Sequence, residues 1–252
     1  MSSPLSGPGR GSVSASAPPA PGENEITAAR ALLATLALDG ALVTGDAIHA
    51  QAETAQLVPE RGGDYLFALK ANRPAMLEAV VACFADPPEA LESFETTDAD
   101  HGRIETRCHR VTHDVEWLFG NRAEPGEPVM PGLATLACVT ATRTATRTAT
   151  RGEGAPSTRY YLSSAPLTPQ RFANAVRSHW AIENSLHWVL DVTFDEDAAR
   201  NRADNGPENL AILRRLTLNL LRTARPKLPI SRKRKRSGWS DAFARSVIGQ
   251  MR

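Results

Sequence analysis

Residues 41–46 read Ala41-Leu42-Val43-Thr44-Gly45-Asp46, and residues 65–70 read Tyr65-Leu66-Phe67-Ala68-Leu69-Lys70. Both runs are short and apolar, which is typical of buried strands. Each is followed by a helical pattern, Ala50 to Glu60 after the first and Pro74 to Phe84 after the second. Two strands separated by a helix predict a parallel pair with a right-handed crossover. The fold is therefore expected to have an α/β core.

The rest of the chain adds strands and helices to this core. One more helix, Glu25 to Leu38, precedes it. The last expected helix carries Leu210, Leu213, Leu216 and Leu220, which the helical period predicts as a core stripe. The expected strands run from Arg103 to His113, Leu133 to Thr142 and Arg159 to Ser163, and the expected later helices from Pro169 to Leu190 and Pro207 to Thr223.

Composition excludes several classes of protein. The 252 residues are 42% hydrophobic, and 29 Lys and Arg against 28 Asp and Glu leave a net charge of +1. A charged partner must therefore meet a local patch, not a global field. No apolar run approaches the roughly 18 residues of a spanning helix. The three cysteines are few and far apart, which suits a reducing compartment, and we expect a cytoplasmic protein without a membrane partner.

Three segments have a biased composition. Residues 1–23 are almost all Ser, Pro, Gly and Ala and are expected to be disordered. Residues 139–156 contain three TATR repeats, which fit either an extended hairpin arm or a mobile insert without function. Residues 226–252 are expected to form a basic tail, which leaves residues 24–225 as the main domain.

Two carboxylates occupy positions that suit metal chemistry. Asp46 follows the first strand, at the edge where open α/β sheets place ligands. Glu183 lies in the segment His179-Trp180-Ala181-Ile182-Glu183-Asn184, which reads as a helix. Two such carboxylates could share Mg²⁺, which prefers oxygen ligands. By spacing alone, a helix cap at Asp46 and a solvated helix face at Glu183 remain the alternatives.

Longer motifs surround these two carboxylates. They include Asn24-Glu25-Ile26-Thr27-Ala28, Val43-Thr44-Gly45-Asp46-Ala47, Ala68-Leu69-Lys70-Ala71-Asn72, His101-Gly102-Arg103-Ile104-Glu105, Tyr160-Tyr161-Leu162-Ser163-Ser164, and His179 to Asp197. The most specific of them has the form HWxIENxLHWVLDVxFxED. Together these motifs resemble the DDE-type transposases of bacterial insertion sequences, in the branch of H-repeat-associated proteins, and the similarity spans Glu23 to Arg225.

The resemblance implies a ribonuclease-H-like fold that uses three acidic residues and two Mg²⁺ ions, with Mn²⁺ as a substitute. Asp46 matches the second acidic position and Glu183 the third, while the strand of the first is missing from this sequence. The expected protein is therefore an N-terminally truncated transposase with impaired strand transfer. Its partners would be element ends and target DNA, on which copies of the chain would assemble. The alternative is a DNA-binding remnant without catalysis.

Further residues receive roles by resemblance or by charge. His179, Asn184 and His187 could support Glu183, although packed histidines are equally expected. Lys70 and Asn72 follow a strand and are candidates for DNA phosphate contacts. The other DNA-binding candidates are Arg214, Arg215 and the run Arg232-Lys233-Arg234-Lys235-Arg236, for which a solvated tail is the alternative.

Overall fold

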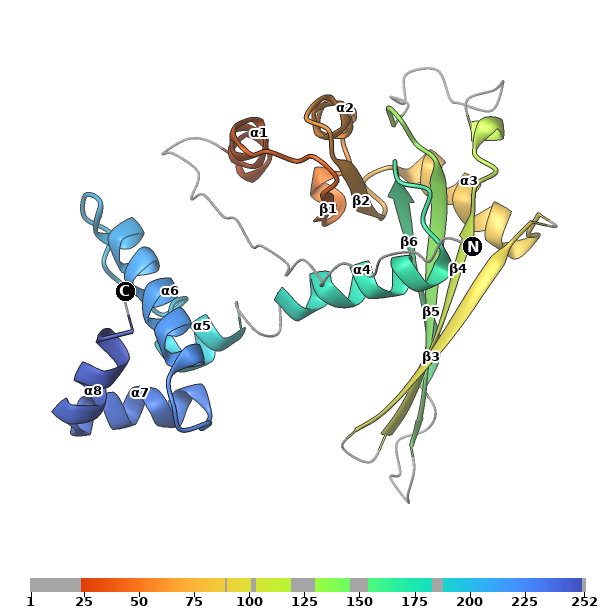
Figure 1. The fold of residues 1–252 in the computed structure, drawn as a ribbon. Helices are drawn as coiled ribbons and strands as arrows, with labels where there is room; N and C mark the ends of the chain where they lie inside the picture. The colour runs from red at the N-terminus through yellow and green to blue at the C-terminus, as the bar shows by residue number, and fades with distance from the viewer. Residues whose placement is uncertain are drawn as a thin grey trace, which may run out of the picture. The chain divides into compact units, whose positions relative to one another are not determined.

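The computed structural model of the protein describes residues 24–88, 90–100, 103–118, 130–145, 154–182 and 188–250 (Figure 1). The chain forms two compact units, residues 1–179 and residues 180–252. The predicted disordered tail, residues 1–23, lies outside the described residues, as do the central repeats of the TATR segment. No described helix is both long enough and apolar enough to cross a membrane.

The first unit is built on a mixed sheet. Its described strands form one six-stranded sheet in the order β1-β2-β6-β5-β4-β3. Strands β1 and β2 are parallel, and every other neighbouring pair is antiparallel. The strands are β1 (Leu42–Gly45), β2 (Asp64–Leu69), β3 (Glu92–Asp100), β4 (Arg103–Thr112), β5 (Thr135–Ala145) and β6 (Gly154–Ser163).

The predicted parallel pair is confirmed. Helix α2 (Ala52–Glu60) connects β1 to β2, and Val43 pairs with Tyr65 across the two strands. Helices α1 (Glu25–Thr35) and α3 (Pro74–Ala85) also lie close to their predicted bounds. Among the described strands β1 pairs only with β2, so the opposite side of β1 is an edge of the sheet.

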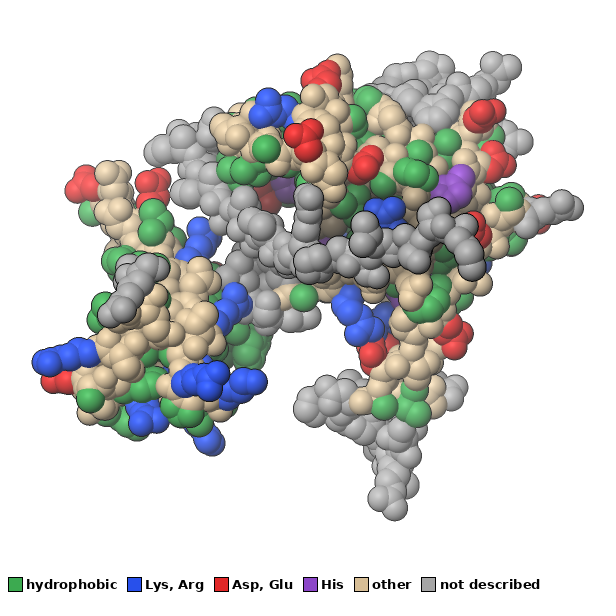
Figure 2. All heavy atoms as spheres, in the orientation of Figure 1, with side chains coloured by type: hydrophobic (Ala, Val, Ile, Leu, Met, Phe, Trp, Pro, Cys, Tyr) green, Lys and Arg blue, Asp and Glu red, His purple; other side chains and the backbone are tan. Residues whose placement is uncertain are grey.

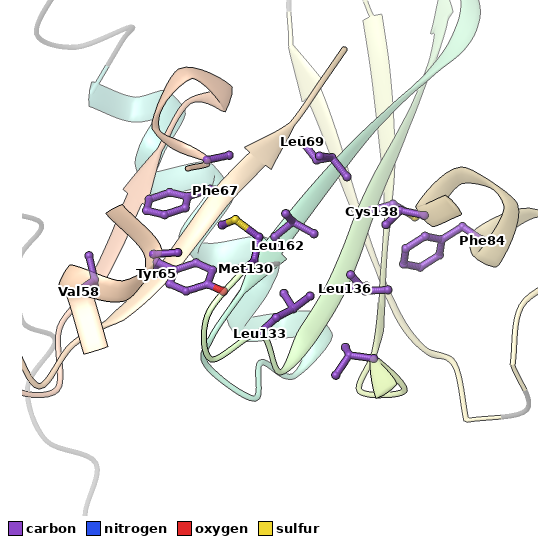
Figure 3. Close-up of a cluster of buried hydrophobic side chains, with 14 of the residues drawn as sticks. Val58, Tyr65, Phe67, Leu69, Phe84, Met130, Leu133, Leu136, Cys138 and Leu162 are labelled. Atoms are coloured by element: carbon purple, nitrogen blue, oxygen red, sulfur yellow. The ribbon is translucent and has the colours of Figure 1, made fainter. Parts of the chain in front are cut away.

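Strand β2 is the most deeply buried element, since five of its six residues are buried. Its side chains alternate between two apolar layers, because successive residues of a strand point to opposite faces. Tyr65, Phe67 and Leu69 pack in the layer that includes Val58 of α2 and Phe84 of α3 (Figure 3). The other layer contains Leu66 and Ala68 of β2 together with Phe172 and Val176 of α4 (Pro169–Ile182). The sheet is thus covered by helices on both faces.

The β-rich region differs from the prediction in one strand. Residues 92–100 form β3, which the sequence analysis missed because their side chains are mostly polar and show no apolar alternation. The start of the TATR segment belongs to β5, where Thr140 pairs with Thr158 of β6. For the described repeat residues, the hairpin-arm interpretation is therefore confirmed.

The second unit is helical. Residues 226–252, expected as a tail, contain helices α7 (Ile230–Trp239) and α8 (Asp241–Ile248), which pack with α5 (Trp188–Phe194) and α6 (Gly206–Thr223). Phe243 and Val247 of α8 bury an apolar face against Leu221, so the described residues of the predicted basic tail form packed helices.

The core stripe predicted for α6 is wrong for Leu210, Leu213 and Leu216, whereas Leu220 packs against the buried cluster around Leu221. Leu213 and Leu216 are 54% and 38% exposed, whereas Leu218 and Leu221 are buried. Helix α6 has leucines on more than one side, so the helical period alone does not identify the side that packs inward.

Candidate functional site

The centre of the candidate site is Asp46, at the carboxyl end of β1. Asp46 occupies the N-cap position of a short 3₁₀ helix, Ala47–His49, yet its side chain makes no capping hydrogen bond. Its side chain is 56% exposed. The helix-cap alternative is therefore not supported, and the carboxylate is presented to solvent.

Lys70 is the neighbour of this carboxylate. It directly follows β2, and the ends of parallel strands meet at the same edge of a sheet. Its Nζ lies 3.5 Å from Oδ1 of Asp46. Because both side chains are more than half exposed, the pair is worth about 0–1 kcal/mol, and the lysine can leave the carboxylate at little cost.

Asn72 stabilises the turn that carries Asp46. Its Nδ2 donates a 2.7 Å hydrogen bond to the backbone oxygen of Ala47. We predicted Asn72 as a DNA contact, but in the structure its amide nitrogen is hydrogen-bonded to the protein backbone. Asn72 thus links the end of β2 to the residue that follows Asp46.

Close packing under the turn explains the glycine before Asp46. A Cβ atom on Gly45 would lie 3.1 Å from the ring of Phe67 and 3.2 Å from Cβ of His49. A larger residue at position 45 would therefore force Phe67 or His49 to shift. No role was predicted for Gly45 from the sequence, although a small residue next to a strand-end carboxylate was the available signal.

His179 connects helix α4 to the same strand. Its Nδ1 lies 3.1 Å from Oγ1 of Thr44, two residues before Asp46. The contact holds His179, the first residue of the HWxIEN motif, beside β1, the strand that Asp46 follows. Glu183, Asn184 and His187 themselves lie outside the described residues.

A complete metal centre is not visible in the described part of the chain. Within the described ranges, no three His, Cys, Asp or Glu side chains are grouped so that they could hold a metal ion. Asp46 is the described carboxylate of the predicted pair, and its pairing with Glu183 stays a prediction. On β4, away from this site, His109 is buried against Phe172, and this burial lowers the pKa of its imidazole.

The predicted basic run lies on α7 and is divided by the helix. Lys233 is only 3% exposed, and its Nζ donates hydrogen bonds of 2.7 Å and 2.6 Å to the backbone oxygens of Leu221 and Ala224. As a surface contact for DNA, Lys233 is therefore a wrong prediction: it binds the carbonyls at the end of α6.

Two other residues of the run also contact the protein. Arg234 donates to the backbone oxygen of Thr193 and stacks over Phe194, and Arg236 stacks over Phe243 at 4.7 Å. Arg232 and Lys235 are exposed.

The arginines predicted on α6 are half-buried. Nη1 of Arg214 lies 4.0 Å from a carboxylate oxygen of Glu196, at the long limit of an ion pair. Nε of Arg215 is buried and has no hydrogen-bond partner among the described residues. Both side chains are thus less accessible to DNA than the prediction assumed.

Comparison with known proteins adds a family relationship. The family described as "Transposase DDE domain" matches residues 12–220. The chain is 36% identical over 231 residues to "Putative transposase YncI" of Escherichia coli O157:H7, with 89% of this chain and 57% of that protein covered. It is 34% identical over 230 residues to "H repeat-associated putative transposase YhhI" of Escherichia coli K12, with 89% and 59% covered. The chain thus spans less than two thirds of the length of these relatives.

Proposed function

The chain belongs to the family of transposases with a DDE domain, and we propose that it acts in insertion-sequence transposition through a carboxylate site at the end of β1. The observation that carries this proposal is the placement of Asp46. Its carboxylate extends from the carboxyl end of a parallel strand, makes no capping bond and reaches solvent beside Lys70. The partner that follows from the family is DNA.

Asp46 fits the role of a ligand for a hard cation. Its oxygens are of the type that Mg²⁺ and Mn²⁺ bind, and the cation that pairs with it among the described residues, Lys70, is weakly held. We propose Glu183 as the second ligand. A pair of Mg²⁺ ions would supply a potent oxygen nucleophile and stabilise the leaving oxygen of a phosphodiester.

The surrounding residues of this chain hold and complement Asp46. Asn72 fixes the backbone that follows it, and His179 holds α4 to Thr44. If a metal ion were bound by the Asp46 carboxylate, the ammonium of Lys70 could contact a phosphate oxygen of bound DNA instead. Lys70 is thus proposed as a DNA contact, and Asn72 and His179 as positioning residues.

The ribonuclease-H-like arrangement is part of the proposal. A mixed sheet with a parallel pair, covered by helices on both faces, is consistent with it. By resemblance, the motifs of this sequence match two of the three acidic positions, at Asp46 and Glu183. Impaired strand transfer stays our prediction, since catalytic groups that act as a unit lose most of their rate when one is removed. Assembly of several copies on DNA is likewise proposed.

Metal binding by the full chain tests the role of Asp46 directly. Mn²⁺ affinity would be measured by electron paramagnetic resonance for the wild type, for Asp46→Asn and for the control Asp86→Asn, which changes an exposed carboxylate at the end of α3. We expect Asp46→Asn to weaken binding about tenfold or more, and the control to change it little. Equal affinities for all three proteins would overturn the assignment.

The exposed cations of α7 favour a second candidate function, that of a DNA-binding protein without catalysis. DNA assays distinguish this candidate from the enzyme. The substrates are a supercoiled plasmid and a labelled duplex with a 3′-hydroxyl end, in the presence of Mg²⁺ or Mn²⁺. Metal-dependent nicking that Asp46→Asn abolishes supports the enzyme. Salt-sensitive binding without nicking, unchanged in Asp46→Asn, supports the binding protein. Joining of the labelled end to the plasmid would contradict the expected impairment.

A further inference from the structure

The charge of the chain is concentrated at its carboxyl end. Between Arg225 and Gln250 there are eight Lys and Arg residues and one acidic residue, Asp241, whereas the whole chain has a net charge of +1. Figure 2 shows that Lys and Arg side chains predominate over α7 and α8. This part of the second unit therefore has the local positive field that an anionic partner requires.

Helix α7 separates these charges by the side on which they lie. Lys233 points into the unit, and Arg234 and Arg236 stack on aromatic rings of α5 and α8. Arg232 and Lys235 are three residues apart, so they lie on one side of the helix, and both are exposed. Neither side chain makes a hydrogen bond, ion pair or ring contact within the described part of the chain. These two cations are available to a partner.

An exposed tryptophan shares this side of the helix. Trp239 follows Lys235 by four residues and Arg232 by seven, which places all three on one helical face. It is 83% exposed, more than any other large hydrophobic residue of the described chain. Tryptophan is highly buried on average, so an indole held in solvent on the same helix face as two cations suggests a contact made only with a partner.

We propose that this face, Arg232, Lys235 and Trp239, binds unpaired DNA: the two cations contact phosphates and the indole stacks on a base. The inference rests on the proposed function, which makes DNA the partner. A flat indole face beside cations is the combination by which proteins bind single strands without reading sequence, because every base has a π-face. A duplex offers its phosphates to Arg232 and Lys235 but keeps its bases stacked, so Trp239 should favour a single strand or a frayed end.

Fluorescence anisotropy of the full chain with two labelled probes tests the proposal. The probes are a 20-nucleotide single strand and a blunt duplex of the same sequence. Because one base stack contributes about 1–3 kcal/mol, Trp239→Ala should weaken single-strand binding roughly 5- to 150-fold and change duplex binding less than about twofold. Trp239→Phe, which keeps an aromatic ring, should restore most of the loss. Unchanged single-strand binding in Trp239→Ala, or an equal loss on both probes, would overturn the proposal.

Salt dependence tests the two cations separately. The double variant Arg232→Ala/Lys235→Ala should weaken both probes and lower the single-strand slope of log K against log salt by about 1.4. The control is Arg245→Ala, which removes an exposed charge from α8 outside this face. An equal loss of slope in the control would mean that general charge, not this face, binds DNA.

Two outcomes distinguish this inference from the proposed function. If the wild type binds duplex DNA and Trp239→Ala binds both probes as tightly as the wild type does, only the role of the face fails. If the wild type binds neither probe, DNA fails as the partner as well. Binding to phosphatidylserine vesicles that depends on Trp239, with no binding to the single strand, would assign the face to a lipid surface and overturn the proposal.

Discussion

The end of β1 in the first unit and helix α7 in the second both carry charged residues that the sequence marks as functional, but the structure treats them differently. Asp46 comes directly after a short strand, as predicted, and its carboxylate reaches solvent. Of the five basic residues of α7, Lys233 is buried and the other four are exposed, and two of these four, Arg234 and Arg236, stack on rings. A strand end fixes the place of one residue, whereas five consecutive residues of a helix point in all directions.

Substitution of Phe67, the buried ring that packs against the residue before Asp46, should cause the largest loss of stability. Phe67→Ala removes a fully buried ring that touches Gly45 from below, and we expect it to lower the free energy of unfolding by about 3–5 kcal/mol. Urea denaturation followed by circular dichroism measures this loss. Ile48→Ala, at a 43% exposed position in the same turn, should cost much less. Similar losses for both would mean that the turn does not depend on the core beneath it.

The buried lysine of α7 should come next. Lys233→Ala leaves the backbone oxygens of Leu221 and Ala224 without their donor, which should lower the free energy of unfolding by about 1–3 kcal/mol. Lys235→Ala, two residues further on the exposed side, should stay within about 0.5 kcal/mol of the wild type. Thermal denaturation of the pair measures the difference. Equal losses of stability for the two variants would mean that Lys233 is not more deeply engaged with the protein than Lys235.

Contacts around the carboxylate should give a smaller effect. Asn72→Ala removes the hydrogen bond to Ala47 and should lower the free energy of unfolding by about 1 kcal/mol. Lys70→Ala breaks an exposed ion pair and should cost less, within about 0.5 kcal/mol. Urea midpoints rank the two variants. A larger loss for Lys70→Ala would show that the ion pair, not the amide, holds the turn.

The smallest effect concerns pH. Burial lowers the pKa of His109 from its ordinary value of 6.5, so below pH 6.5 the unfolded chain binds a proton that the folded chain does not. The stability that neutral His109 contributes is complete above pH 6.5 and is lost as the pH falls towards the folded pKa. His109→Gln should therefore reduce the drop in melting temperature between pH 7.5 and pH 5.5. His113→Gln, at an exposed position, is the control and should leave that drop unchanged.

The sequence was sufficient where an element shows one clear period. The parallel pair follows from two apolar runs. For the Thr-rich repeat the sequence left a hairpin arm and a mobile insert open, and pairing with β6 favours the arm at the described residues. It was insufficient where apolar residues surround a helix or are scarce in a strand. Helix α6 buries Leu218 and Leu221 in place of the predicted stripe, and β3 forms from polar residues because it pairs along its whole length with β4.

By itself, the sequence determined the family, the α/β core and the position of Asp46 at a strand end, because local periodicity and motif order are written in neighbouring residues. Only the tertiary structure decided the contacts between distant residues. It joined His179 to Thr44 across 135 positions, engaged Asn72 with Ala47, and turned Lys233 inward while Trp239 stayed in solvent. The physical reason is that a helix or strand fixes the direction of each side chain, but its packed neighbours decide which of those directions is buried.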